Sequence, residues 1–257
     1  MKKILFNIGG YNIYSYGLMI AIGVILGVYL FSKRASKDGK YDSDKLLNLA
    51  IITLICGFLG SKLLFIIVEF KSIMNDPSIL WDFGNGFVVY GGIILGAVGL
   101  ILYCKVKKWD VLEILDYAAP SVALAQGFGR IGCFLAGCCY GAETDFPISV
   151  VFPVDSLAPA GVHLHPTQLY SAGFDFALAI FLFLYSEYKK HTGNVVSMYA
   201  IVYSIGRFSV EFLRDDPRGS IGVLTTSQFI AIMTFILGIT LFVMCKRKGR
   251  SESVEKK

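Results

Sequence analysis

The chain has 257 residues, of which 55% are hydrophobic and 17% charged, with a formal net charge of +5 and a mean hydropathy of +0.62. A water-soluble domain of this size does not need so many apolar residues, whereas a bundle of membrane-spanning helices does. The composition therefore excludes an ordinary soluble globular protein, and no nucleic-acid partner is expected. It predicts one integral membrane domain over residues 1–257, without a soluble appendage.

Seven apolar runs follow one another along the chain, each long enough or nearly long enough to cross a bilayer as a helix. They lie at residues 14–32, 47–69, 87–104, 111–136, 169–186, 195–213 and 223–245. Residues 7–12 are too polar for the apolar core of a cleavable signal peptide, so the first helix is expected to be retained. The spacings Gly23-x-x-x-Gly27 and Gly92-x-x-x-Gly96 are typical of close helix packing.

The basic residues are distributed unevenly over the connections between these runs. Sixteen Lys or Arg fall in the connections at 33–45, 105–110, 187–193 and 246–257. Only five fall in those at 1–13, 70–86, 137–168 and 214–222. Because cytoplasmic loops carry the excess of Lys and Arg, the first set is expected in the cytoplasm. The sequence thus predicts an all-α integral membrane protein with about seven transmembrane helices, its N-terminus outside and its C-terminus cytoplasmic.

The longest outer connection is residues 137–168. It contains four prolines, which are poorly compatible with a continuing helix: Pro147, Pro153, Pro159 and Pro166. We expect this connection to form a small irregular extracytoplasmic head, where a water-soluble substrate enters.

A glycine-rich block at residues 127–141 closes the fourth apolar run and contains Arg130. An isolated cation in hydrocarbon costs roughly 2.5 kcal/mol or more, so Arg130 requires an anionic partner or water. The spacing Gly127-x-Gly129-x-x-Gly132 matches a dinucleotide fingerprint by accident, because no strand precedes it. Glycines at a helix end instead allow close approach of a phosphate to backbone N–H groups. The block predicts a lipid-phosphate site.

A second arginine, Arg207, lies in the sixth apolar run. Tyr203, Arg207 and Glu211 recur at helical spacing and therefore share one face of a helix. Two interpretations stay open at this point. Arg207 and Glu211 form an internal ion pair that keeps two charges in the bundle, or Arg207 contacts a lipid phosphate together with Arg130.

Several blocks, taken in their order along the chain, resemble the prolipoprotein diacylglyceryl transferase family. The resemblance extends from about residue 14 to 245. The blocks are Tyr16-Gly17-Leu18, Tyr90-Gly91-Gly92, the glycine-rich block at 127–141, His165-Pro166-Thr167-Gln168-Leu169-Tyr170, and residues 203–214.

This resemblance implies a multi-pass enzyme of the bacterial cytoplasmic (inner) membrane. Its lipid substrate would be phosphatidylglycerol, and its partner a prolipoprotein signal peptide with a lipobox cysteine. The diacylglyceryl group would pass to the cysteine thiol, giving a thioether and glycerol phosphate. Arg130 and Arg207 would bind the phosphate, and no cofactor or metal is expected. The other residues implied at the site are Tyr16, Tyr90, Gly91, Gly92, Gly141, Tyr203 and Glu211, with His165 and Gln168 at the outer rim.

The chain departs from the family pattern at three positions. Tyr90 stands where a histidine normally precedes the paired glycines, and Cys133 and Cys138 replace an asparagine and a glutamate. A tyrosine has an ordinary pKa near 10, so it is a poor base at neutral pH. Two alternatives follow from these departures. One is a divergent paralogue that uses another thiol or hydroxyl acceptor; the other is a non-catalytic protein that binds anionic lipid.

The six cysteines do not form the pattern of a secreted disulfide protein, and only Cys133, Cys138 and Cys139 cluster. The first interpretation of this cluster is simple packing among helix ends. The second is a reactive thiol, because a nearby cation such as Arg130 lowers a thiol pKa. Zinc ranks third, because the spacing C-x4-C-C is unusual for a tetrahedral site.

Overall fold

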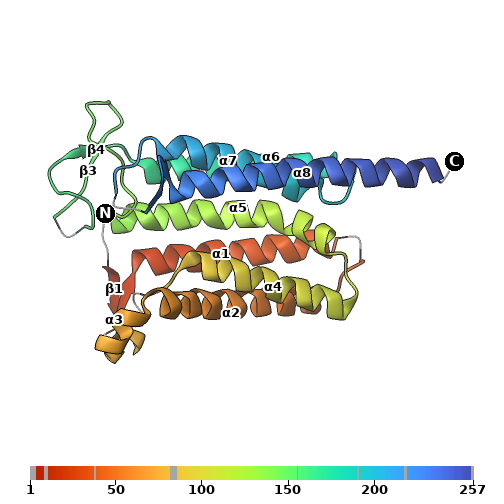
Figure 1. Cartoon of the computed structure of the whole chain (residues 1–257), viewed down its shortest axis with the longest axis horizontal. Coiled ribbons are helices and arrows are strands. Elements are labelled where there is room, and N and C mark those ends of the chain that lie inside the picture. Colours follow the sequence, from red (N-terminus) through yellow and green to blue (C-terminus); the bar gives the residue numbers. More distant parts are fainter. Residues whose placement is uncertain are drawn as a thin grey trace. The chain divides into compact units, whose positions relative to one another are not determined.

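The structure is a computed structural model that describes residues 4–8, 11–37, 39–81, 86–154, 156–189, 191–216 and 219–255 (Figure 1). This part of the chain is mainly helical. Its helices are α1 (Ser15–Ala35), α2 (Ser43–Val68), α3 (Phe70–Asn75), α4 (Val89–Lys107), α5 (Val111–Ala136), α6 (Thr167–Glu187), α7 (Asn194–Glu211) and α8 (Thr226–Glu255). A short 3-10 helix, η1 (Pro77–Trp81), follows α3.

Five of the described helices are long and apolar enough to cross a membrane: α1, α2, α4, α6 and residues Thr226–Lys248 of α8. Helices α5 and α7 are not among them, because polar side chains lower their mean hydropathy. These two helices carry Arg130 on α5, and Arg207 and Glu211 on α7. The protein is therefore a helical, multi-pass membrane protein. The two long helices that are not apolar enough to be counted as spans, α5 and α7, carry Arg130, Arg207 and Glu211.

Three short antiparallel strand pairs accompany the helices in the described residues, and the sequence did not predict them. They are β1 (Ile4–Ile8) with β2 (Tyr11–Tyr14), β3 (Val150–Val151) with β4 (His163–Leu164), and β5 (Ser220–Ile221) with β6 (Leu224–Thr225). The pair β3–β4 lies within the connection at 137–168. There Phe152, Ala158 and Leu164 form a small buried cluster, so this connection has a core of its own.

The chain forms two compact units, Met1–Phe31 with Leu115–Lys257, and Ser32–Ile114. In the smaller unit, α2 packs along α4. A Cβ atom added to Gly91 would lie 2.2 Å from the carbonyl oxygen of Gly60, and one added to Gly92 would lie 2.8 Å from that of Gly57. Gly91 and Gly92 therefore allow the two helix backbones to approach closely, which is the packing expected of small residues in membranes.

In the larger unit, α5, α6 and α7 meet at a buried apolar cluster, and α7 also packs against α8 (Figure 1). The cluster consists of Ala119 and Ala123 of α5, Leu178, Ala179 and Leu182 of α6, and Val195 of α7. Helix α1 joins this unit through its glycines. A Cβ atom on Gly23 would lie 2.9 Å from Cβ of Phe128, and one on Gly27 would lie 3.2 Å from the carbonyl oxygen of Ser121.

A buried carboxylate on α5 fixes the start of α7. Asp116 Oδ1 accepts hydrogen bonds from the backbone N–H groups of Val195 and Val196, at 3.0 and 2.9 Å. Its Oδ2 accepts from the Gly193 N–H at 2.8 Å and from Lys189 Nζ at 3.1 Å. The first N–H groups of a helix have no partner within the helix, and a negative charge there also complements the helix dipole. Asp116 thereby positions the helix that carries Arg207.

Replacing Asp116 with asparagine is expected to destabilise the protein by about 3 kcal/mol or more, because an amide leaves part of a buried charged network without its partner. The measurement is the midpoint of thermal unfolding of the full chain in detergent. Asp145→Asn is the matched control, since Asp145 is exposed. Equal midpoints for the two variants would contradict the assigned role of Asp116.

Candidate active site

The end of α5, the first half of α6 and the second half of α7 line a small, partly open cavity. Its volume is about 10 Å³, which is about the space of one water molecule. The lining residues are Arg130, Ser171, Phe174, Asp175, Tyr203, Gly206, Arg207 and Val210. A phosphate group is larger than a water molecule, so these side chains have to move apart to admit one.

Arg130 lines this cavity, and among the described residues its guanidinium has no hydrogen-bond acceptor. Within the described ranges, its guanidinium forms no ion pair and no hydrogen bond with another residue. It interacts electrostatically with Tyr203 and, more weakly, with Asp175. A cation in an apolar segment is costly unless an anion or water meets it. Arg130 is therefore placed to receive an anionic ligand.

Arg207 lines the same cavity and is anchored on two sides. Its Nη1 lies 3.1 Å from Glu211 Oε2, one helical turn further along α7. Its Nη2 donates a hydrogen bond of 2.7 Å to Ser227 Oγ at the start of α8. The ion pair that was one of the two interpretations of the sequence is thus present. Arg207 also borders the cavity, so the pair does not exclude a second contact with a ligand.

Glu211 connects two arginines to strand β6. Its side chain is fully buried, and Arg214 Nη1 lies 3.8 Å from the same Oε2 atom that faces Arg207. Its Oε1 accepts a hydrogen bond of 2.7 Å from Thr225 Oγ1 of β6. Arg214 in turn donates to Asp216 from Nε and Nη2, at 2.9 and 2.8 Å. Glu211 therefore orders the cationic face of the cavity.

Asp175 is a lining residue that the sequence interpretation missed. It lies on α6 with only 3% of its surface exposed and interacts electrostatically with both Arg130 and Arg207. The signal was available, because an acidic residue inside an apolar span is costly and marks a functional site by default. Ser227 and Thr225, which hold Arg207 and Glu211, left no such signal.

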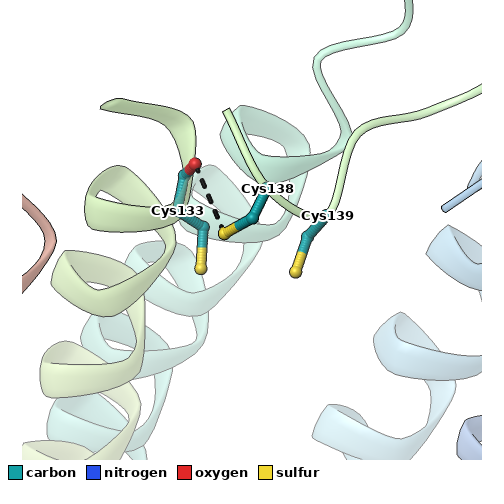
Figure 2. A group of neighbouring side chains, drawn as sticks. All are labelled: Cys133, Cys138 and Cys139. Carbon is teal, nitrogen blue, oxygen red and sulfur yellow. Dashed lines mark hydrogen bonds between the residues drawn. The ribbon is translucent and has the colours of Figure 1, made fainter. Parts of the chain in front are cut away.

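Three thiols lie together at the end of α5 (Figure 2). The Sγ atoms of Cys133, Cys138 and Cys139 all lie within 4.8 Å of one another. Cys133 belongs to the last turn of the helix, and Cys138 Sγ lies 3.7 Å from its carbonyl oxygen. Gly137 and Cys139 have φ angles of 75° and 61°, so the chain turns back sharply and brings the later thiols toward Cys133.

The first residues of α6 hold this turn in place. Gln168 Nε2 donates to the carbonyl oxygen of Cys138 at 2.8 Å, and Thr167 Oγ1 donates to that of Cys139 at 2.8 Å. Both side chains belong to almost fully buried residues. Gln168 is therefore a buried residue that supports the thiol turn, and its place at the outer rim of the site stays a prediction.

Gly141 and His165 lie where three backbone segments converge. The Gly141 N–H donates to the His165 carbonyl oxygen at 3.0 Å, and Gly141 forms an antiparallel bridge with Arg214. A Cβ atom on Gly141 would lie 2.7 Å from the carbonyl oxygens of both His165 and Leu213. Only glycine fits here without displacing backbone. The imidazole of His165 is half-buried, with Nδ1 3.3 Å from the Tyr170 hydroxyl oxygen.

The remaining expected site residues fall in different units. Tyr16, at the start of α1, interacts electrostatically with the three thiols and with Arg130, and Tyr203 does so with Arg130. Both tyrosines thus belong to the arginine and thiol region of the larger unit. Tyr90, Gly91 and Gly92 belong to α4 of the smaller unit, where Tyr90 is exposed.

The thiol of Cys139 is electrostatically favoured as a thiolate. Interactions with the Cys133 and Cys138 thiols, and then with the guanidinium groups of Arg214 and Arg130, lower the pKa of Cys139 below its usual range. The same hydrogen bonding raises the pKa of Cys138. Of these two thiols, Cys139 is therefore the one favoured in the charged form.

A lowered pKa predicts the pH dependence of alkylation at Cys139. For an ordinary thiol, the labelling rate should fall about fiftyfold between about pH 8.5 and pH 6.5, as the thiolate is protonated. At Cys139 we expect less than a fivefold fall, because its thiolate persists at the lower pH. Iodoacetamide labelling of the reduced, metal-free protein at the two pH values, followed by peptide mass spectrometry, measures the labelling rate at Cys139. A fiftyfold fall at Cys139, equal to that of free N-acetylcysteine labelled under the same conditions, would contradict this.

Together, the fold and the site define a multi-pass membrane protein with two arginines at a small cavity and a thiol cluster near them. The family model for prolipoprotein diacylglyceryl transferase matches residues 3–244. The chain belongs to this family.

Relatives of known name cover almost the whole chain. It is 57% identical over 257 residues to phosphatidylglycerol–prolipoprotein diacylglyceryl transferase 2 of Clostridium perfringens, covering 100% of both chains. It is 56% identical over 242 residues to phosphatidylglycerol–prolipoprotein diacylglyceryl transferase of Clostridium tetani, covering 94% of this chain and 97% of that one. The corresponding Clostridioides difficile protein is 33% identical over 256 residues, covering 99% and 100%.

Proposed function

We propose that this protein transfers the diacylglyceryl group of phosphatidylglycerol to the lipobox cysteine in the signal peptide of a prolipoprotein. The observation that carries the proposal is the position of Arg130. It faces a cavity, has no bound acceptor among the residues that the structure describes, and lies beside a second arginine that is already anchored. An anionic phosphodiester is the natural ligand for such a pair, because arginine binds phosphate oxygens with two parallel hydrogen bonds.

The reaction proceeds by attack of sulfur on carbon. The acceptor thiol loses its proton to water, and the thiolate attacks the glycerol carbon that carries the phosphate. A C–S bond forms while the C–O bond breaks, and the electron pair of that bond remains on the phosphate oxygen. Glycerol phosphate leaves with one more negative charge than the diester had. Arg130 and Arg207 stabilise this developing charge in a site of low dielectric constant.

The other residues are assigned supporting roles in this proposal. Tyr16 and Tyr203 shape the head-group site, Glu211 holds Arg207 in position, and Gly141 keeps the turn after α5 closed. His165 lies beside Gly141 at the edge of the site, and Gln168 supports the thiol turn. The roles of Tyr90, Gly91 and Gly92 in catalysis and substrate binding rest on family membership alone.

We also propose that residues 1–257 form a single membrane domain of seven spans in the bacterial inner membrane, in which α5 and α7 cross the membrane in addition to the five more apolar helices. The N-terminus lies outside and the C-terminus in the cytoplasm, with the head at 137–168 on the outer side. The basic residues support this orientation: Lys33 and Arg34 end α1, and Lys105 and Lys107 end α4.

The test uses purified protein in detergent with phosphatidylglycerol. Release of glycerol phosphate is measured with a synthetic lipobox peptide, with the same peptide carrying serine for cysteine, and without peptide. We expect release only with the cysteine peptide. Retention of phosphatidylglycerol without release in any of the three samples would indicate a lipid-binding protein. Release with the serine peptide would indicate a hydroxyl acceptor.

A further inference from the structure

We propose that Cys133, Cys138 and Cys139 bind a Zn²⁺ ion through their three sulfur atoms and leave its fourth position open for the thiol of the acceptor peptide. The zinc site itself stands on the geometry of the cluster. Its part in catalysis rests on the proposed function. The linear spacing of the three cysteines did not indicate a metal site, whereas the folded turn places their sulfur atoms together.

The spacing of the sulfur atoms fits a zinc ion. Zinc bonds thiolate sulfur at about 2.3 Å with tetrahedral angles, which places two sulfur ligands about 3.8 Å apart. The three Sγ atoms lie within 4.8 Å of one another. Contraction by at most about 1 Å therefore converts the observed cluster into three ligands of one ion. Figure 2 shows the three side chains near one another, Cys133 on the helix end and Cys138 and Cys139 on the turn that follows it.

The backbone that carries these ligands is held on both sides. The carbonyl groups of Cys138 and Cys139 accept hydrogen bonds from the buried Gln168 and Thr167, and Cys133 is fixed by helix α5. A metal site needs ligands that are positioned before the ion arrives. These contacts leave the three side chains free to turn toward a common ion.

The charges around the cluster also suit the ion. Three thiolates and one Zn²⁺ carry a net charge of −1. Two guanidinium groups, those of Arg130 and Arg214, interact electrostatically with Cys139. Soft thiolate ligands favour zinc over magnesium or calcium, which prefer oxygen. The negative charge of the site is thus offset by cations that the protein already places there.

The cluster supplies three protein ligands among the described residues, without a fourth His, Cys, Asp or Glu in the same group. Structural zinc sites are closed by four protein ligands, whereas catalytic sites keep one position for water or substrate. The substrate of the proposed reaction is itself a thiol. A thiol that coordinates zinc is deprotonated outright, so the open position converts the acceptor into a nucleophile.

In the full step, the acceptor thiol replaces water on the zinc and releases its proton to solvent. Its sulfur then attacks the phosphate-bearing glycerol carbon, the C–S bond forms, and the C–O bond breaks. The electron pair goes to the phosphate oxygen, beside Arg130 and Arg207. The thioether product is a neutral and weaker ligand, so it leaves the zinc. Zinc keeps its oxidation state, and no oxidant or reductant is needed.

The first experiment measures metal binding independently of activity. Reduced, metal-free full-length protein in detergent is titrated with Zn²⁺ against a chromophoric chelator, and separately with Co²⁺ as a spectroscopic probe. We expect one equivalent of metal and a thiolate-to-cobalt charge-transfer band. Each of Cys133→Ser, Cys138→Ser and Cys139→Ser should weaken binding at least tenfold, because even outer groups at zinc sites change affinity by about that much. Cys56→Ser, in the smaller unit, should leave the affinity unchanged.

The second experiment adds the lipobox peptide to the cobalt form. A further increase in the charge-transfer band is expected with the cysteine peptide and none with the serine peptide. The zinc site is overturned if no band appears, if the band survives the three cluster substitutions, or if two of the thiols are found in a disulfide that excludes metal. An unchanged spectrum with the cysteine peptide overturns the claim that the acceptor thiol binds at the fourth position of the metal.

The zinc inference and the proposed function fail in different ways. Transfer by a metal-free Cys133→Ser/Cys138→Ser/Cys139→Ser variant at the wild-type rate would overturn the role of zinc and leave the proposed function intact. Stoichiometric metal binding without transfer to any peptide would leave the metal site intact and overturn the proposed function.

Discussion

Replacing Arg130 with glutamine is expected to lower the rate of diacylglyceryl transfer by about a hundredfold to a thousandfold, the loss typical of removing one preorganised donor from a developing oxyanion. The reason is the position of this residue. Its guanidinium faces the cavity and has no competing acceptor among the described residues, so its charge is available to the phosphate. Glutamine keeps a hydrogen-bond donor of reduced reach but removes the charge. The measurement is initial-rate release of glycerol phosphate in the presence of the cysteine peptide.

Two further variants separate charge from shape at this position. Arg130→Lys retains the charge and loses the two parallel donors, so an intermediate rate is expected. Arg247→Gln removes an exposed arginine near the end of α8 and should leave the rate unchanged. Normal transfer by Arg130→Gln, in protein that unfolds at the wild-type temperature, would remove Arg130 from the site.

Replacing Glu211 with glutamine is expected to reduce both stability and transfer. The carboxylate lies between Arg207 and Arg214 and is fully buried. Breaking a buried ion pair by removing one partner costs about 3–5 kcal/mol, because the remaining charge is left uncompensated. Here two arginines lose their shared partner, and Arg207 also loses the contact that aims it. The measurements are the thermal unfolding midpoint in detergent and the transfer rate.

The loss of stability and the loss of lipid binding in Glu211→Gln can be measured separately. Ligand binding stabilises the folded state, so excess phosphatidylglycerol should raise the unfolding midpoint of wild-type protein more than that of Glu211→Gln. Glu143→Gln, on an exposed residue of the head, serves as the control and should match wild type. A Glu211→Gln protein with unchanged midpoint and rate would show that the carboxylate neither holds Arg207 nor offsets its charge.

The helices were largely predictable because their apolar runs have clear ends. Helix α5 begins and ends at Val111 and Ala136, which are the ends of the fourth apolar run. Asp110 precedes this helix and accepts hydrogen bonds from the backbone N–H groups of Leu112 and Glu113, and Gly137 follows it with a positive φ. Helix α8 continues to Glu255, well beyond the apolar run that ends at 245. Charged helix-forming residues extended it, and hydrophobicity gives no signal for their conformation.

The pairs β3–β4 and β5–β6 were not predictable, because strands of two residues carry no readable alternation. These strands pair because the flanking helices end and begin at positions that bring the two strands together. The pair β5–β6 shows this best, since it brings Thr225 to Glu211.

In the candidate site as well, contacts between residues close in sequence could be predicted, and contacts between distant residues could not. The Arg207–Glu211 pair was visible as a helical spacing of four residues. The contacts of Gln168 with Cys138 and of Arg207 with Ser227 join residues 30 and 20 positions apart, which a single sequence does not reveal. The thiol cluster was visible as three nearby cysteines. Its convergence depends on two positive φ angles, at Gly137 and Cys139, and the second of these falls on a residue type that rarely adopts them.

The most direct test of the central claim is mass spectrometry of a lipobox peptide after incubation with the purified protein and phosphatidylglycerol. We predict that the cysteine peptide gains the mass of one diacylglyceryl group, attached to sulfur, and that the serine peptide gains nothing. A cysteine peptide that stays unmodified, in a sample where the folded protein binds phosphatidylglycerol, would contradict the assignment of this protein as a prolipoprotein diacylglyceryl transferase.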